Sequence, residues 1–303
     1  MKIKEVVMKE FFNTTKVMNE LCKGAIKITG DQNSNSGWNY IQVGTKKQSA
    51  VVNVKLTGRF EKKELEKLTL SAVDRDIMDA VFSLYIAEEL DVTPEMIIRA
   101  YSGNPQKDTT DAFQKVVVNT LDKLMRLTIQ IECMEQLELM QMSTRNNKSI
   151  YKGPLLSLEK KVECENGGKK IVYHISGMPV LYQYALMVKH ICSVSSELLN
   201  IPGKRTGRED TMIARYLIRR ISAMRNKKNS MKSRHIVYER RCDQGMLRQL
   251  GYSEEGYKNW SDKKFKIHRT VIRYLDHFVK YGYISGYVIL KKKRSFYGIE
   301  IKL

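Results

Sequence analysis

The chain has 303 residues, of which 42% are hydrophobic and 28% are charged, and its formal net charge is +20. This composition excludes an intrinsically disordered tail and leaves enough apolar side chains for two cores. Because no run of 18 apolar residues and no apolar signal segment occurs, we expect neither a transmembrane helix nor a secretory signal. The five cysteines form no Cys-x-x-Cys pair. This spacing is typical of reduced thiols, so the sequence predicts a cytoplasmic protein.

The first predicted region, residues 1–66, is a leader that contains a β-hairpin. Residues 39–56 carry β-branched and aromatic side chains on both sides of a Gly-Thr-Lys-Lys tip. Such a pattern is typical of two antiparallel strands joined by a turn. We therefore expect a β-containing leader before the first helical domain.

The second predicted region, residues 67–177, has the element order of a winged helix. Three amphipathic helical segments come first, and a hairpin with a Gly-containing turn follows at 155–176. The second helix begins with Thr93 and Pro94, a frequent pair at helix starts. Since the third helix mixes charges of both signs, we expect this domain to pack on a partner, such as a second copy of the chain, in dimerisation. A connecting helical segment, residues 178–202, follows it.

The last predicted region, residues 203–303, repeats that order of elements. A helix begins after Thr206, and Glu209 completes a capping box with it. A short helix closed by Gly251 and a long helix stopped by Gly282 come next, and a hairpin ends the region. The sequence thus predicts an α+β fold, mainly α, with two winged-helix domains in tandem.

The positive charge is concentrated in this last region. Residues 203–303 hold 26 Lys and Arg against 9 Asp and Glu, a net charge of +17, whereas all other residues together have a net charge of +3. A general surplus for solubility would be spread along the chain, so a localised one indicates a polyanionic partner. The sequence therefore predicts a nucleic-acid-binding C-terminal domain.

The long helix of this domain carries a continuous polar stripe. At 100° per residue, one side of the helix consists of Lys266, Thr270, Arg273 and His277. The opposite, apolar side begins with Phe265 and includes His268, which we interpret as a core or boundary residue. A helix-turn-helix presents its second helix to the major groove in this way.

We expect four groups of residues to contact DNA. The predicted major-groove side chains are Lys266, Arg269, Thr270, Arg273 and His277, and the predicted phosphate ligands at the start of the same helix are Lys263 and Lys264. The predicted backbone contacts of the preceding helix are Gln244 and Arg248. The hairpin tip takes the wing position, where its cations would follow phosphates or enter the minor groove; it consists of Lys291, Lys292, Lys293 and Arg294.

Motifs for catalysis are missing from the sequence. No phosphate-binding GxxxxGK[ST] loop and no His-Glu-x-x-His or paired Cys/His spacing occurs. The five histidines form neither the His-x-His pair of a rolling-circle nickase nor the His-x-x-Arg of a tyrosine recombinase. We therefore expect no enzymatic activity, no cofactor and no metal site.

Five further segments carry a resemblance to a known family. They are YIQVGT (40–45), LTLSAVDRDIMDAVFSLY (68–85), TPEMIIRAYSG (93–103), GPLLSLEKKV (153–162) and MPVLYQYA (178–185). With the order of elements, they resemble replication initiator proteins of plasmids and mobile elements in Gram-positive gut bacteria, over about residues 38–303. The layout is also similar to that of iteron-binding initiators, whose C-terminal winged helix binds origin repeats and whose N-terminal one contributes to dimerisation and to extra DNA contacts; the resemblance thus implies auxiliary DNA contacts for residues 67–177.

The resemblance implies a replication initiator that binds specific duplex DNA at repeated origin sites and promotes origin opening. The implied partners are double-stranded DNA, host replication proteins and a second copy of the chain, which would associate through residues 67–177. No membrane partner is expected. Two alternatives remain open: a winged-helix transcriptional regulator with the same DNA-binding end, and a basic interaction protein that binds RNA or an acidic partner.

Overall fold

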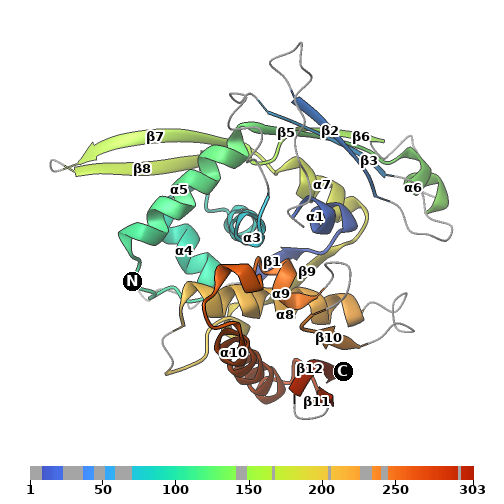
Figure 1. Ribbon diagram of the computed structural model, residues 1–303. Helices are drawn as coiled ribbons and strands as arrows, with labels where there is room; N and C mark the ends of the chain where they lie inside the picture. The colour runs from blue at the N-terminus through green and yellow to red at the C-terminus, as the bar shows by residue number, and fades with distance from the viewer. Residues whose placement is uncertain are drawn as a thin grey trace. The chain divides into compact units, whose positions relative to one another are not determined.

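The computed structural model describes residues 9–22, 37–43, 52–58, 70–140, 149–165, 168–203, 206–225, 234–239, 245–292 and 295–303. These residues form two compact units (Figure 1). The N-terminal unit comprises Glu10–Tyr101 and Pro105–Ser193, and the C-terminal unit comprises Ser102–Asn104 and Val194–Leu303, together with Lys9. Each unit combines helices with small sheets, so the chain is an α+β protein.

The N-terminal unit contains two antiparallel sheets and an additional pair of strands. In chain order its elements are β1 (Lys9–Asn13), α1 (Lys16–Leu21), β2 (Gly37–Val43), β3 (Val52–Gly58), α3 (Ala72–Ile86), β4 (Asp91–Val92), α4 (Pro94–Ser102), α5 (Asp111–Met125), β5 (Leu127–Glu132), α6 (Met134–Leu139), β6 (Ile150–Pro154), β7 (Leu158–Glu165), β8 (Gly168–Ile175), α7 (Val180–Met187) and β9 (Ile191–Ser195). One sheet has the order β2-β3-β5-β6, the other has the order β4-β8-β7, and β1 pairs with β9.

Helix α3 is at the centre of the N-terminal core. It begins at a capping box, in which the Ser71 hydroxyl accepts the Asp74 N–H and the Asp74 carboxylate accepts the Ser71 N–H. All side chains from Asp76 to Leu84 are buried. The helix is therefore surrounded by other elements of the unit, and Figure 1 shows it between α5 and α1.

A buried carboxyl group on α3 joins three segments of this core. Asp79 is 0% exposed, and its Oδ1 accepts the Asn13 backbone N–H at 3.0 Å and the Tyr182 hydroxyl at 2.7 Å. Tyr182, on α7, also stacks on Phe82 of α3 with ring centroids 4.3 Å apart. Strand β1, α3 and α7 are thus held together by polar and aromatic contacts at one place.

The C-terminal unit is built on two long helices and one small sheet. Its elements are η1 (Ser196–Leu198), α8 (Arg208–Arg225), β10 (His235–Val237), α9 (Met246–Gln249), η3 (Glu254–Gly256), α10 (Trp260–Lys280), β11 (Gly286–Lys292) and β12 (Ser295–Lys302). The antiparallel sheet has the order β10-β12-β11. Strand β10 lies so close to β12 that a Cβ at Gly298 would be 2.8 Å from the Ile236 carbonyl oxygen, so this position requires glycine.

The two units have the same connectivity. In the N-terminal unit α3, β4, α4, α5, β7 and β8 follow one another, and in the C-terminal unit α8, β10, α9, α10, β11 and β12 do. In both, the short first strand pairs with the second strand of the hairpin. The N-terminal unit differs because β5, α6 and β6 are inserted before its hairpin, and β5 and β6 join β2 and β3 in the other sheet.

Three segments differ from the sequence predictions. Residues 178–202 are not helical throughout, because α7 ends at Met187 and β9 follows. His235–Val237, where the sequence predicted no strand, forms β10 by pairing with the distant strand β12. Helix α8 begins at Arg208, one residue later than predicted from a cap at Thr206, and the Gly207 N–H donates to Asp210 at 3.0 Å. These differences depend on long-range partners or on a choice between neighbouring polar residues.

Candidate nucleic-acid interface

Helix α10 is the longest helix among the described residues and positions the candidate interface. Its 21 residues include no Pro or Gly. The Asn259 side chain caps its start by accepting the Asp262 N–H at 3.2 Å, and Gly282, with a φ of 65°, follows its end. The buried side of the helix consists of Ile267, His268, Val271, Tyr274, Leu275, His277 and Phe278.

The predicted polar stripe of α10 is not exposed along its whole length. The Thr270 hydroxyl donates to Asp210 Oδ1 at 3.0 Å, and Arg273 Nη2 donates to the same oxygen at 2.7 Å. His277 is 6% exposed, and its Nε2 lies 2.8 Å from the Glu197 carbonyl oxygen. The polar stripe therefore does not continue as an exposed surface through these three positions, because Thr270 and Arg273 bond to α8 and His277 bonds to η1, although the buried Nε of Arg273 has no hydrogen-bond partner. Their role in the major groove stays a prediction that would require these hydrogen bonds to break.

The exposed side of α10 is centred on Arg269. Lys266 and Arg269 are exposed, and within the described ranges neither makes an ion pair or a hydrogen bond. Phe265 is 54% exposed, although the periodicity predicted it on the apolar side. It lies about 160° around the helix axis from Ile267, too far from the buried side to reach the core. The first three turns of α10 thus present two unpaired cations and an aromatic ring.

The two lysines at the start of α10 already have partners. Lys263 forms an ion pair with Glu209. The Lys264 Nζ lies 3.4 Å from a carboxylate oxygen of Glu239 and 5.8 Å from the Trp260 ring centroid. A phosphate group at this helix end would have to compete with both carboxylates, so the predicted phosphate contacts of these lysines require an exchange of partners.

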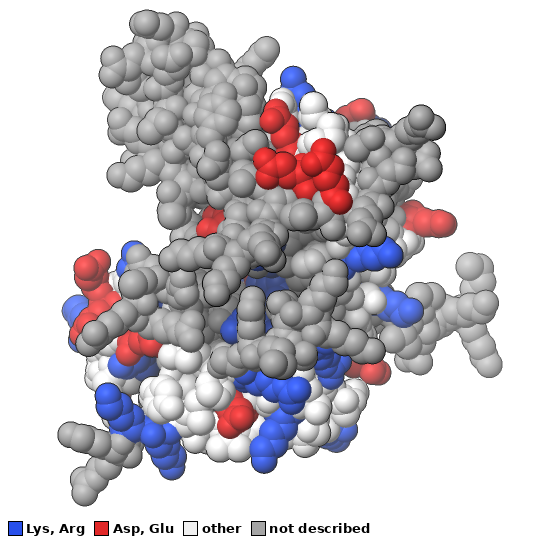
Figure 2. Space-filling view, turned by 90° about the vertical axis from the view of Figure 1, so that its right-hand side faces the viewer, with Lys and Arg blue, Asp and Glu red and all other residues white. Residues whose placement is uncertain are grey.

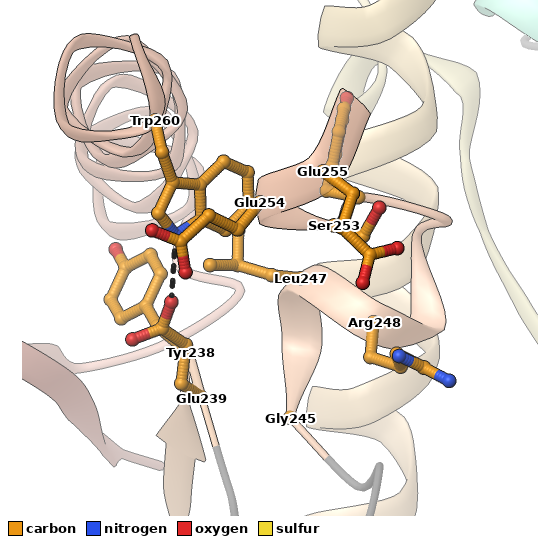
Figure 3. A pocket seen from close by; sticks show the side chains of 10 residues that line it. Tyr238, Glu239, Gly245, Leu247, Arg248, Ser253, Glu254, Glu255 and Trp260 are labelled. Atoms are coloured by element: carbon orange, nitrogen blue, oxygen red, sulfur yellow. Dashed lines mark hydrogen bonds between the residues drawn. The ribbon is translucent and has the colours of Figure 1, made fainter. Parts of the chain in front are cut away.

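A hollow of about 280 Å³ lies beside this end of α10 (Figure 3). The indole N–H of Trp260 donates to Glu239 Oε1 across 3.2 Å at one side of it. On another side, Arg248 of α9 is exposed, and Figure 3 shows its side chain pointing away from Trp260. Arg248 is therefore accessible from solvent, as its predicted contact with the DNA backbone requires.

The hairpin β11–β12 is anchored on α10 by an aromatic cluster. Phe296 of β12 stacks on the His268 ring with centroids 3.8 Å apart, and the Tyr238 hydroxyl lies 2.7 Å from His268 Nδ1. Lys291 of β11 is opposite Phe296 in the strand register. This exposed lysine is therefore held near the same half of α10 that carries the unpaired cations.

Figure 2 shows several Lys and Arg side chains on the face that is turned to the viewer. The exposed cations on α9, α10 and β11 are Arg248, Lys266, Arg269, Lys280, Lys291 and Lys292. Three of the predicted DNA-binding residues, Gln244, Lys293 and Arg294, lie outside the described residues. The positive face thus combines one side of a helix with one strand of the hairpin that packs on it.

The aromatic cluster makes the stability of the C-terminal unit depend on pH. Burial, with a smaller contribution from the charge of Lys291, lowers the pKa of His268 from its ordinary value of 6.5. Below that value the unfolded chain binds more protons than the folded one, so the stability is complete above a pH of about 6.5 and falls as the pH is lowered toward the folded pKa.

The variant His268→Gln is expected to show a flatter decline of the unfolding free energy between pH of about 7 and about 5 than the unmodified chain. Urea unfolding at a series of pH values measures this difference. Lys291→Gln is expected to flatten the decline less, because burial is the larger cause of the pKa shift. A decline in His268→Gln as steep as that of the unmodified chain would contradict the assignment.

The corresponding helix and hairpin of the N-terminal unit carry mixed charges. Asp122 of α5 pairs with Lys160 of β7 at 2.8 Å and accepts the Tyr173 hydroxyl at 3.2 Å. Lys123 of the same helix pairs with Asp74 at 2.5 Å. Because these charges are balanced within the unit, no cationic face comparable to that of α10 is found on the described residues of α5.

Other kinds of site have little support in the described part of the chain. There, no group of three or more His, Cys, Asp or Glu side chains could hold a metal ion, and no helix is long and apolar enough to cross a bilayer. Cys22, Cys133 and Cys192 form no disulfide bond within the described ranges. Burial raises the pKa of Cys133 to about 11, which keeps this thiol protonated and poorly nucleophilic.

Fold and site together define an α+β protein with two units of equal connectivity and a cationic helix–hairpin face on the second.

No protein-family model and no curated protein matches the sequence. Two solved structures of domains 2 and 3 of RctB are similar. One, a selenomethionine derivative, has a TM-score of 0.45 and 10% identity over 94% of this chain and 96% of that chain. The other has a TM-score of 0.44 and 10% identity, over 95% and 97%. Similarity at this level assigns the chain to no family.

Proposed function

We propose that the chain is a replication initiator of a plasmid or mobile element, which binds specific duplex DNA. Each unit would be a winged helix, in which a short strand pairs with the second strand of a hairpin that follows three helices. The observation that carries the proposal is the unpaired cationic side of α10, with Lys266 and Arg269, next to a hairpin that carries Lys291 and Lys292.

In this proposal the first turns of α10 enter the major groove. Arg269 has the planar fork that donates to guanine O6 and N7, and Lys266 can donate to the same acceptors or to a phosphate. Lys291 and Lys292 extend the contact to the adjacent phosphates, where each neutralised charge releases counterions. The C-terminal unit would thus supply both sequence recognition and most of the electrostatic affinity.

The role in replication depends on the arrangement of sites on DNA. Several copies bound to repeated origin sites would place much positive charge on one duplex segment and help to open the neighbouring duplex. Host replication proteins would then bind the opened DNA. Self-association through residues 67–177 would hold the copies together. The chain would not cut DNA itself, since its sequence contains none of the nickase or recombinase motifs.

The proposal is tested by selecting duplexes from a random DNA pool with the purified chain and sequencing the retained molecules. Directly repeated sites are the expected result for an initiator. A single inverted repeat would favour a transcriptional regulator instead. Failure to retain any duplex, or a clear preference for RNA over duplex DNA, would contradict the proposed function.

The hairpin contribution is measurable through its salt dependence. Replacing Lys291 and Lys292 together with alanine is expected to reduce the slope of log affinity against log salt concentration by about 1.8, since each phosphate contact adds about 0.9. Binding isotherms at four or more salt concentrations give this slope. An unchanged slope would remove the hairpin from the interface.

A further inference from the structure

The exposed ring of Phe265 has no aromatic stacking partner among the described residues. It lies on α10 four residues before Arg269 and directly before Lys266, on the side of the helix that carries these unpaired cations. The ring is 54% exposed, while Ile267 and Val271 of the same helix are 1% and 0% exposed. An aromatic ring held in water beside two cations is poorly placed for packing and well placed for a partner that is both anionic and apolar.

The major groove of DNA is such a partner. Its edges carry hydrogen-bond acceptors and phosphates surround it, and the only apolar group that the bases present there is the thymine C5-methyl. Phe265 and Arg269 are separated by about 6 Å along the helix axis, which is roughly the spacing of two base-pair steps. One side of α10 can therefore contact a methyl group and a guanine edge at the same time.

We propose that Phe265 is a specificity-determining residue that reads a thymine methyl group one or two base pairs from the guanine contacted by Arg269. This inference rests on the proposed function and adds to it the base that the apolar part of α10 selects. The selected DNA sites are then expected to contain thymine close to guanine at a constant position.

The test combines a variant of the chain with the removal of a single methyl group from the DNA. The duplex is one selected by the unmodified chain, in which each thymine is replaced in turn by uracil, so that only the methyl group is removed. At one position this replacement is expected to weaken binding about three- to tenfold. The variant Phe265→Ala is expected to lose the same factor on the thymine duplex and nothing more on the uracil duplex.

Two controls separate recognition from general effects. Val279→Ala removes another exposed apolar side chain of α10, at the far end of the helix, and is expected to leave affinity unchanged. Phe265→Leu is expected to keep most of the affinity, since leucine also contacts a methyl group. The thermal unfolding midpoint of Phe265→Ala should equal that of the unmodified chain because the ring is largely exposed.

The outcomes distinguish this inference from the proposed function. If the unmodified chain retains no duplex, the proposed function fails and the inference fails with it. If the chain binds its duplex but Phe265→Ala binds it equally well, the inference alone is overturned. Equal losses of Phe265→Ala on thymine, uracil and unrelated duplexes would overturn it as well, because they would show a contact without base discrimination.

Discussion

Replacing Lys266 and Arg269 together with alanine is expected to lower the affinity for the selected duplex by a factor on the order of 100. Both side chains are exposed and, within the described residues, have no protein partner. Their removal therefore breaks no internal ion pair, and the free energy of unfolding should change by less than about 0.5 kcal/mol. The loss should be larger for the selected site than for unrelated duplexes, since Arg269 is proposed to read a base.

The control for this variant removes the same charge elsewhere in the unit. Arg234, directly before β10, and Lys302, on β12, are also exposed, and replacing both with alanine lowers the net charge by the same amount. Fluorescence anisotropy on labelled duplexes compares the two double variants. If both lose affinity equally, the effect is one of net charge alone, and the assignment of α10 to the major groove is wrong.

The largest expected effect on stability lies in the N-terminal unit, at Asp79. The variant Asp79→Ala is expected to lower the free energy of unfolding by about 3–5 kcal/mol. It leaves the Asn13 N–H and the Tyr182 hydroxyl buried without their acceptor. The free energy of unfolding falls by this amount because the two buried donors cannot form hydrogen bonds with water in the folded state.

Two variants show whether the unpaired donors are the reason. The double variant Asp79→Ala/Tyr182→Phe removes one donor along with the acceptor. Its total loss of unfolding free energy should therefore be smaller than the sum of the losses of the two single variants. Asp91→Ala removes a carboxylate that is 67% exposed and pairs with His174, and it should lose less than about 1 kcal/mol. Urea unfolding followed by far-UV circular dichroism measures all of them. A loss below about 1 kcal/mol for Asp79→Ala would refute the described network.

Local features of the chain were predictable from the sequence because they depend on neighbours along the helix. Pro94 begins α4 after Thr93, and Gly282 follows the end of α10 with a positive φ. Caps of this kind are satisfied within one helical turn, so the residues that make them are visible in a short stretch of sequence. The order of helices and hairpins, with short strands missed, followed from the same local patterns.

The exposed side of α10 could not be predicted in the same way. The periodicity separates polar from apolar positions, and it placed Thr270, Arg273 and His277 with Lys266 on one polar side. Polar side chains are equally compatible with water and with a distant internal partner. In the structure Thr270 and Arg273 are hydrogen-bonded to Asp210, and His277 is hydrogen-bonded to the Glu197 carbonyl. The exposed side is centred on Arg269 instead.

By itself, the sequence determined where the charge lies, where the long helices α3, α5, α8 and α10 run, and the order of helices and hairpin within each unit. Charge and periodicity are properties of the chain that need no knowledge of distant contacts. The tertiary structure alone decided that β10 pairs with β12, that β5 and β6 leave the helix–hairpin order to join another sheet, and that Phe265 faces solvent. Each of these features depends on contacts between residues that are far apart in the sequence. The free energy of such contacts cannot be read from a short segment of the chain.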